Sequence, residues 1–159
     1  MFRLFSILLL TLAAATACGS SGKSSATTST TTGGTDTQSY VAAGNQVCIR
    51  SDKRIFKIGR LSRDPKGWQA TATVAKGAVL EMRKVKPTPA RAAAFSEMLH
   101  YGNALALAVQ QVHDALVKSN LDTASAAQFA AAQIQDKVHT AAKAAGLTFC
   151  QQPLTNWPA

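Results

Sequence analysis

The chain has 159 residues and a formal net charge of +9, and 47% of its residues are hydrophobic but only 6% aromatic. This length leaves room for one domain with a hydrophobic core and excludes an array of several domains. The charge is uneven, because most basic residues lie between residues 50 and 91 and the remainder of the chain is close to neutral.

The N-terminus has the three parts of a signal peptide. Arg3 supplies the positive charge, residues 4–15 form an apolar run, and small residues follow up to Ala17. A membrane-spanning helix needs about 20 apolar residues, which is more than this run offers. We therefore predict that residues 1–17 are a signal peptide that directs export.

The residues at the end of this segment read ATAC (15–18) and resemble a bacterial lipobox. The resemblance implies that the thiol of Cys18 carries a diacylglycerol and that Cys18 becomes the first residue of a lipoprotein. Residues 18–39 are rich in Ser, Thr and Gly, which predicts a disordered tether after the lipidated cysteine. The expected location is the extracytoplasmic face of the cell membrane, and glycosylation of the tether is left open.

Two further cysteines, Cys48 and Cys150, remain once Cys18 is assigned to the lipid. Export implies an oxidising compartment, in which a cysteine pair normally forms a disulfide. The chain has no CxxC or CxxCH motif, so a redox motif and a c-type haem site have no support. We predict a Cys48–Cys150 disulfide.

The first predicted helix covers residues 40–63, whose apolar and basic residues recur on opposite faces. The sequence DPKG at 64–67 predicts a turn. Residues 68–85 have helical spacing but also alternate over WQATATV, so we predict a helix and keep a strand as the alternative. Pro87 ends this element, since a residue before proline disfavours the helical conformation.

A third helix is predicted to start at Thr88 as its cap, with Pro89 at the first helical position, and to run to Leu116. The sequence KSNLDT at 118–123 breaks it, with Asn120 suited to the left-handed conformation. The fourth helix is predicted over residues 123–145, and Gly146-Leu147 fits a glycine stop followed by a hydrophobic residue.

Short connections between long amphipathic helices indicate an all-α fold, an antiparallel four-helix bundle in up-down-up-down order over residues 40–159. In such a bundle the start of the first helix and the end of the fourth lie at the same end. Cys48 and Cys150 are near these two positions. The predicted fold is therefore a bundle closed by one disulfide.

Three further stretches, together with Cys18 and the Ser/Thr tether, resemble a family of small lipoproteins of actinobacterial type. The stretches are GNQVC at 44–48, KPTPARAAAF at 86–95 and AAKAAGLTFC at 141–150. The family has no assigned activity. The resemblance therefore implies location, helices and disulfide, and implies nothing about chemistry.

Two motifs resemble metal-ligand pairs, Glu97 with His100 and Asp136 with His139. Bundle metal sites use carboxylate–histidine pairs of this spacing, but all ligands must point inward. Helical spacing places Glu97, His100 and Asp136 away from the apolar faces, so we predict no metal site. His113 flanks a core face and is expected to be a packing residue. The chain has no GxSxG motif and no Gly-rich phosphate loop, and we predict no enzymatic activity and no cofactor.

The strongest remaining feature is a basic surface predicted to bind anions. It comprises Arg50, Lys53, Arg54, Lys57 and Arg60 on the first helix and Arg83, Lys84, Lys86 and Arg91 around the next loop. Anionic lipid head groups, anionic wall polymers or an envelope protein partner fit this charge, whereas export argues against nucleic acid. A solubilising face without a partner is the alternative reading.

The leading hypothesis is thus a non-enzymatic envelope lipoprotein with a basic binding face. Two alternatives are a module that binds a small ligand between the helices and a metal-dependent bundle enzyme. An apolar cavity is the feature that distinguishes the first alternative, and close packing of alanine is expected to leave little space for one.

Overall fold

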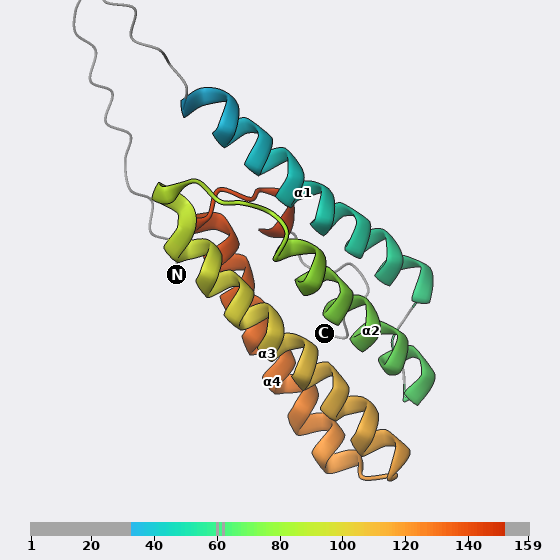
Figure 1. Ribbon diagram of the computed structural model, residues 1–159. Coiled ribbons are helices and arrows are strands. Elements are labelled where there is room, and N and C mark those ends of the chain that lie inside the picture. The colour runs from blue at the N-terminus through green and yellow to red at the C-terminus, as the bar shows by residue number, and fades with distance from the viewer. Residues whose placement is uncertain (1–32, 60, 62, 152–159) are drawn as a thin grey trace, which may run out of the picture. The chain divides into compact units, whose positions relative to one another are not determined.

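The computed structural model describes residues 33–59, 61 and 63–151, and all regular structure within them is helical. Four long helices follow one another, α1 (Gly33–Ile58), α2 (Pro65–Met82), α3 (Ala92–Val117) and α4 (Leu121–Ala144). Two short 3₁₀ helices, Pro89–Arg91 (η1) and Phe149–Gln151 (η2), precede α3 and follow α4 (Figure 1). The all-α prediction is confirmed for the described residues. The predicted signal peptide, Cys18, the predicted tether up to residue 32 and Arg60 lie outside them.

Each helix packs against the next one along the chain, α1 on α2, α2 on α3 and α3 on α4. The C-terminal turn η2 contacts both α4 and α1. Among the described residues, α1 and α4 make no extensive direct contact with each other. The C-terminal turn therefore connects the first and last helices on one side of the domain.

Helix α1 begins at Gly33, earlier than the predicted start at residue 40. Asp36 lies in the first turn, where a carboxylate interacts favourably with the helix dipole, and the Ser39 hydroxyl donates a hydrogen bond to the Asp36 carbonyl. The helix ends at Ile58, before the predicted end at residue 63, because Gly59 adopts a φ of 82°.

The prediction of a turn over residues 64–67 is wrong for residues 65–67, because α2 already begins at Pro65. Asp64 is the N-cap of α2, its carboxylate accepts a hydrogen bond from the Lys66 amide, and Pro65 is the first helical residue. The alternation in WQATATV does not form a strand, since residues 68–82 continue the helix. Inward residues Trp68, Thr71 and Ala72 are buried, as helical spacing requires.

The turn between α3 and α4 uses its residues differently from the prediction. Ser119, not Asn120, takes the left-handed conformation, with a φ of 55°. Asn120 instead caps α4, because its side-chain oxygen accepts a hydrogen bond from the Thr123 amide. Both roles suit asparagine, so the sequence alone did not separate them.

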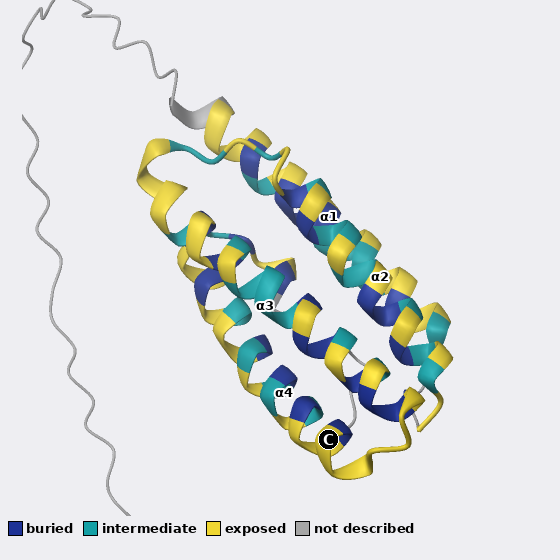
Figure 2. Ribbon diagram, turned by 60° about the horizontal axis from the view of Figure 1, so that its bottom comes forward, coloured by how far each residue is buried: buried dark blue, intermediate teal, exposed yellow. Residues whose placement is uncertain are grey.

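The described residues bury two hydrophobic clusters, one toward each end of the helices. The first surrounds Trp68 and joins α2, α3 and α4. The second surrounds Leu147 and joins the first half of α1 to the ends of α2 and α4 and the start of α3. Figure 2 shows the buried residues along the facing sides of the helices and the exposed residues on their outer sides.

Gly77 lies within α2, and a side-chain carbon added there meets no atom within 4 Å. We expect Gly77→Ala to raise the free energy of unfolding by about 0.5–1 kcal/mol, because alanine loses less backbone entropy in a helix. Urea unfolding followed by circular dichroism measures this change.

Gly146→Ala is the matched control, since the φ of 79° at Gly146 strains any other residue. We expect this variant to be less stable than the natural chain. A Gly77→Ala variant that is also destabilised would contradict the description of α2 as an unobstructed helix at this position.

None of the helices in the described part of the chain has the length and apolar character needed to cross a membrane.

Candidate functional site

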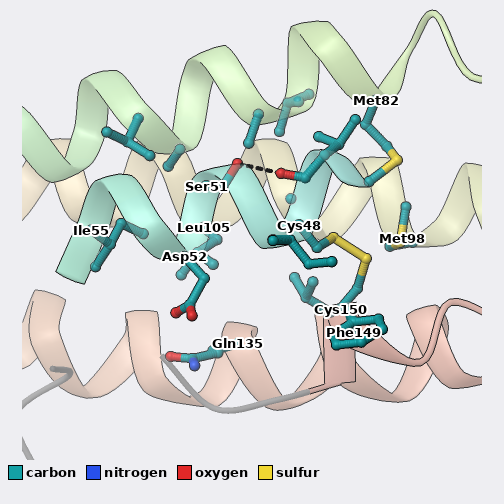
Figure 3. A pocket seen from close by; sticks show the side chains of 18 of the residues that line it. Cys48, Ser51, Asp52, Ile55, Met82, Met98, Leu105, Gln135, Phe149 and Cys150 are labelled. Carbon is teal, nitrogen blue, oxygen red and sulfur yellow. Dashed lines mark hydrogen bonds between the residues drawn. A yellow bond between two sulfur atoms is a disulfide. The ribbon is translucent and has the colours of Figure 1, made fainter. Parts of the chain in front are cut away.

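An apolar cavity of about 300 Å³ lies between the helices, in contrast to the close alanine packing expected from the sequence. Its volume is at the lower end of the range of about 300–1,000 Å³ typical of small-molecule pockets. All four long helices and η2 contribute to its walls (Figure 3). The principal apolar lining residues are Val47, Ile49, Ile55, Val74, Ala75, Ala78, Val79, Met82, Met98, Leu99, Leu105, Val138 and Phe149.

Short side chains explain why this space is not filled. Ala75 and Ala78 of α2 and Gly102 of α3 line the cavity and project little volume into it. A side-chain carbon added at Gly102 would lie 3.2 Å from Val79, so these two helices approach closely behind the cavity wall. The space therefore opens on the other side, toward α1 and α4.

One end of the cavity is formed by Cys48 of α1 and Cys150 of η2. Their sulfur atoms are 1.97 Å apart, which is disulfide-bonding distance, and their Cα atoms are 5.3 Å apart. Met82 and Met98 lie beside them, as Figure 3 shows. Methionine side chains adapt to irregular apolar shapes, which suits a wall that contacts a ligand.

The chain turns from α4 toward α1 through Gly146 and Leu147. Gly146 takes the left-handed conformation, and the Leu147 amide donates a hydrogen bond to the Ala142 carbonyl over 2.9 Å. This is the predicted glycine stop, with a hydrophobic residue after it. Leu147 is 0% exposed and fits against Gly44, where an added side-chain carbon would lie 2.6 Å from a Leu147 methyl carbon. Gly44 thus allows the C-terminal segment to reach α1.

Asn45 of α1 fixes the position of this segment. Its side-chain oxygen accepts a hydrogen bond from the Phe149 amide over 3.1 Å, and its nitrogen donates one to the Thr148 hydroxyl over 3.3 Å. Asn45 is itself buried. The cavity wall at Phe149 and Cys150 is therefore held by polar contacts as well as by the two sulfur atoms.

Tyr40 attaches the first half of α1 to the same end of the domain. Its hydroxyl donates a hydrogen bond to the Ala145 carbonyl over 3.0 Å, and its ring packs edge-to-face on Phe95. Burial raises the pKa of Tyr40, and the charge of Arg91 partly opposes this effect. The phenol is thus neutral at physiological pH and acts as a hydrogen-bond donor.

Two polar side chains, Asp52 of α1 and Gln135 of α4, line the otherwise apolar cavity. Gln135 is only 6% exposed. Within the described part of the chain, neither side chain has a hydrogen-bond or ion-pair partner. Figure 3 shows the carboxylate of Asp52 and the amide of Gln135 pointing toward each other across the space between α1 and α4.

His139 also lines the cavity, one turn of α4 after Gln135. Desolvation by burial lowers the pKa of His139, and the charge of Asp136 raises it by less. The imidazole is therefore neutral near pH 7. A neutral ring is compatible with an apolar lining, whereas a charged ring would favour water in the cavity.

The motifs considered as metal ligands do not converge. Glu97, His100 and Asp136 are exposed. No group of three or more His, Cys, Asp or Glu residues in the described ranges is arranged to hold a metal ion.

His113 contacts the Asp114 carboxylate over 2.8 Å and the Gln110 amide over 3.1 Å. The hydrogen bond from Gln110 is the largest cause that lowers the pKa of Asp114, followed by the contact with His113.

The predicted basic surface is partly neutralised by Glu81 of α2. Arg50 and Arg54 both reach this carboxylate, at 2.7 Å and 3.3 Å. The hydrogen bond from Arg50 is the main cause that lowers the pKa of Glu81. These two arginines are thus committed to joining α1 and α2, and they add less net charge than the sequence indicated.

Two other arginines of this surface have partners in the domain. Arg83 donates to the Asn103 side chain over 3.3 Å, and Arg91 donates to the Ala144 carbonyl over 2.7 Å at the end of α4. Lys53, Lys57, Lys84 and Lys86 are exposed, and none of them has a hydrogen-bond or ion-pair partner among the residues that the structure describes. Lys53 lies at the cavity mouth, and Lys84 and Lys86 border a shallow groove with Ser39 and Tyr40.

The structure thus brings Cys48 and Cys150 together as predicted and places them in the cavity wall. The sequence did not identify Asp52 or Gln135 as site residues. A signal was present in both cases, because each polar side chain lies on a helix between apolar residues that face inward.

Comparison of the chain with models of known protein families, with curated proteins and with solved structures found no match.

Proposed function

We propose that this chain is a membrane-anchored extracytoplasmic lipoprotein whose helical domain binds a small, mainly apolar ligand and catalyses no reaction. The observation that carries the proposal is the cavity of about 300 Å³, whose walls are almost entirely apolar side chains. A pocket of this kind with a few polar groups is the usual form of a small-molecule site.

We propose further that the domain is an antiparallel four-helix bundle in up-down-up-down order, closed by a Cys48–Cys150 disulfide. Consecutive helices pack together, and their connections are short. The two sulfur atoms lie at bonding distance in the cavity wall. The disulfide then keeps the C-terminal turn on α1 and preserves the shape of the cavity.

The membrane anchor rests on the sequence, on the apolar segment before ATAC and on the lipid that this motif implies for Cys18. Membership of the small lipoprotein family is part of the same proposal. Such an anchor tethers the domain to a membrane, whose lipids are a source of apolar ligands. Lipid chains attach a protein without spanning the bilayer.

The test of binding is a fluorescence titration with N-phenyl-1-naphthylamine, a neutral apolar probe. The full chain carries Cys18→Ser so that no acyl chain of its own competes for the cavity. We expect saturable fluorescence enhancement for this protein. Two separate variants, Ala78→Leu and Val74→Phe, add volume to the cavity lining and are expected to weaken binding at least tenfold.

A control for these variants is Leu80→Phe, which adds an aromatic side chain on the exposed side of α2. Circular dichroism melts identify any variant that fails to fold. Binding of equal strength in the control and in both folded cavity variants would contradict the proposed function, because the probe would then bind elsewhere.

A second part of the proposal concerns the basic surface, which we place against anionic lipid head groups or wall polymers. The supporting observation is that Lys84 and Lys86 are exposed and lie beside Ser39 and Tyr40, in the first half of α1. This is the part of the domain that the chain enters from the lipid anchor. An envelope protein partner on the same surface is the alternative occupant.

The prediction for this surface is that Lys84→Gln/Lys86→Gln weakens binding to anionic vesicles about 30-fold at low salt. Each lysine near anionic lipid contributes about 1 kcal/mol, so the pair contributes about 2 kcal/mol. Co-sedimentation of the Cys18→Ser chain with anionic and neutral vesicles across a salt series measures the difference.

Arg50→Gln/Arg54→Gln removes the same formal charge and is the matched control. These arginines already interact with Glu81, so we expect a smaller loss of vesicle binding. Equal losses in both double variants would show that net charge alone governs binding, and absence of binding by every protein would remove the surface from the proposal.

A further inference from the structure

Between α1 and α4 the described lining of the cavity includes the polar side chains of Asp52, Gln135 and His139. Asp52 and Gln135 face each other there, and Ser51 is the adjacent hydroxyl on α1 (Figure 3). The Ser51 hydroxyl is already satisfied, because it donates to the Val47 carbonyl over 2.9 Å. Asp52 and Gln135 face each other and have no partner among the described residues, so they are the groups best placed to interact with a ligand.

Gln135 supplies a second polar side chain to this part of the cavity. An amide in a mainly apolar lining is stabilised by a hydrogen-bonding partner, because few other groups there can satisfy it. Gln135 is 6% exposed, and no fully buried side-chain polar atom of the described residues lacks a partner, so its amide is accessible from the cavity. Its side chain points into the cavity and not into a packed helix interface.

Asp52 determines what kind of partner fits. An ionised carboxylate only accepts hydrogen bonds, so its ligand must supply a donor. The cation nearest in sequence, Lys53, is exposed at the mouth, and Arg50 and Arg54 are engaged with Glu81. The amide of Gln135 both donates and accepts, and it adapts to the atom that binds Asp52.

We infer that the cavity holds an amphiphile with an apolar chain and a polar end that donates hydrogen bonds to Asp52 and Gln135. A hydroxyl or a primary amine meets this requirement, whereas a carboxylate places a second negative charge against Asp52. The apolar chain extends from these two residues toward Met82, Met98 and the Cys48–Cys150 pair. This inference rests on the proposed ligand-binding function and adds the chemical class of the ligand.

Displacement of bound N-phenyl-1-naphthylamine tests it, with the full chain carrying Cys18→Ser. Decanol, decylamine and decanoate have the same apolar chain and differ only in the polar end. We expect decanol or decylamine to displace the probe at concentrations about tenfold or more below those of decanoate, since only the first two can donate a hydrogen bond to the Asp52 carboxylate. Comparison of decanol with decylamine shows whether the site prefers a neutral or a cationic hydrogen-bond donor.

Two variants assign the preference to the residues named. Asp52→Asn is expected to reduce the discrimination against decanoate to within about threefold, and Gln135→Leu to weaken decanol and decylamine without weakening the neutral probe. Asp136→Asn is the matched control, because it removes the same charge from an exposed position outside the cavity lining. It should leave the discrimination unchanged.

The results separate the two levels of the proposal. If the probe does not bind, the ligand-binding function fails and this inference fails with it. If the probe binds and decanoate displaces it as well as the other two compounds do, the cavity remains a binding site and the inferred ligand class is wrong. An effect of Asp136→Asn as large as that of Asp52→Asn would likewise overturn the assignment to Asp52.

Discussion

Reduction of the Cys48–Cys150 pair is expected to lower the free energy of unfolding by about 4–5 kcal/mol. The two cysteines are 102 residues apart, and closing a loop of this length removes much of the entropy of the unfolded chain in the chain-entropy description. Small domains have a total free energy of unfolding of about 5–15 kcal/mol, so this loss is a large share. Urea unfolding with and without dithiothreitol measures it.

The double variant Cys48→Ser/Cys150→Ser should have the stability of the reduced protein and no response to dithiothreitol. The reduced protein should also bind N-phenyl-1-naphthylamine more weakly, because both cysteines line the cavity. Equal stability of the oxidised and reduced protein, or two thiols that react freely without a reductant, would contradict the proposed disulfide.

Truncation of Trp68 is expected to have the second-largest effect. Trp68 is 0% exposed and lies at the centre of the cluster that joins α2, α3 and α4. We expect Trp68→Ala to lower the free energy of unfolding by about 3–5 kcal/mol, because it removes a large buried side chain and leaves a cavity. Thermal unfolding followed by circular dichroism is a suitable measurement.

Phe129→Ala provides the matched aromatic control, since Phe129 of α4 is 68% exposed. Its expected effect is within about 0.5 kcal/mol, as is usual for surface substitutions. A similar loss of stability in both variants would show that the packing around Trp68 is not as described. Trp68 and Leu147 belong to different hydrophobic clusters. Substitution of Trp68 therefore tests the stability of the domain without changing the contacts of the C-terminal turn.

The helices were predictable because their signals are local. Pro89 and the stop at Gly146-Leu147 mark boundaries through backbone geometry that few other residues provide. Boundaries at which two neighbouring residues suit the same role were harder to predict. In the turn between α3 and α4, Ser119 takes the left-handed conformation expected of Asn120, and Asn120 caps α4. The early start of α1 was also missed, because residues 33–39 (GGTDTQS) share the Gly, Ser and Thr composition of the predicted tether.

The cavity was not predictable from the pattern of apolar residues. Such a pattern shows which side of a helix faces inward, but not how far apart two inward faces lie. Alanine favours close approach between α3 and α4, yet Ala75 and Ala78 of α2 leave space opposite α1. The position of α1 depends on Gly44 and Asn45, whose partners are in the C-terminal segment.

The pattern of charged residues also predicted the basic surface only in part, because it does not show which residues of other helices lie close to it. The spacing of Arg50 and Arg54 on α1 correctly indicates that they share a face. It does not reveal that both side chains reach the carboxylate of Glu81, on another helix. Nor does the spacing of charges on α1 reveal that the side chain of Asp52 faces Gln135 in the cavity.

The most direct test of the central claim is a crystal structure of the full chain carrying Cys18→Ser, determined under xenon pressure. Apolar cavities that remain dry bind xenon, and its anomalous signal locates each atom. We expect xenon between α1 and α4, in contact with Ile55, Leu105 and Met98. Xenon bound only elsewhere, or side chains that fill this space, would contradict the account of the domain as an apolar ligand-binding module.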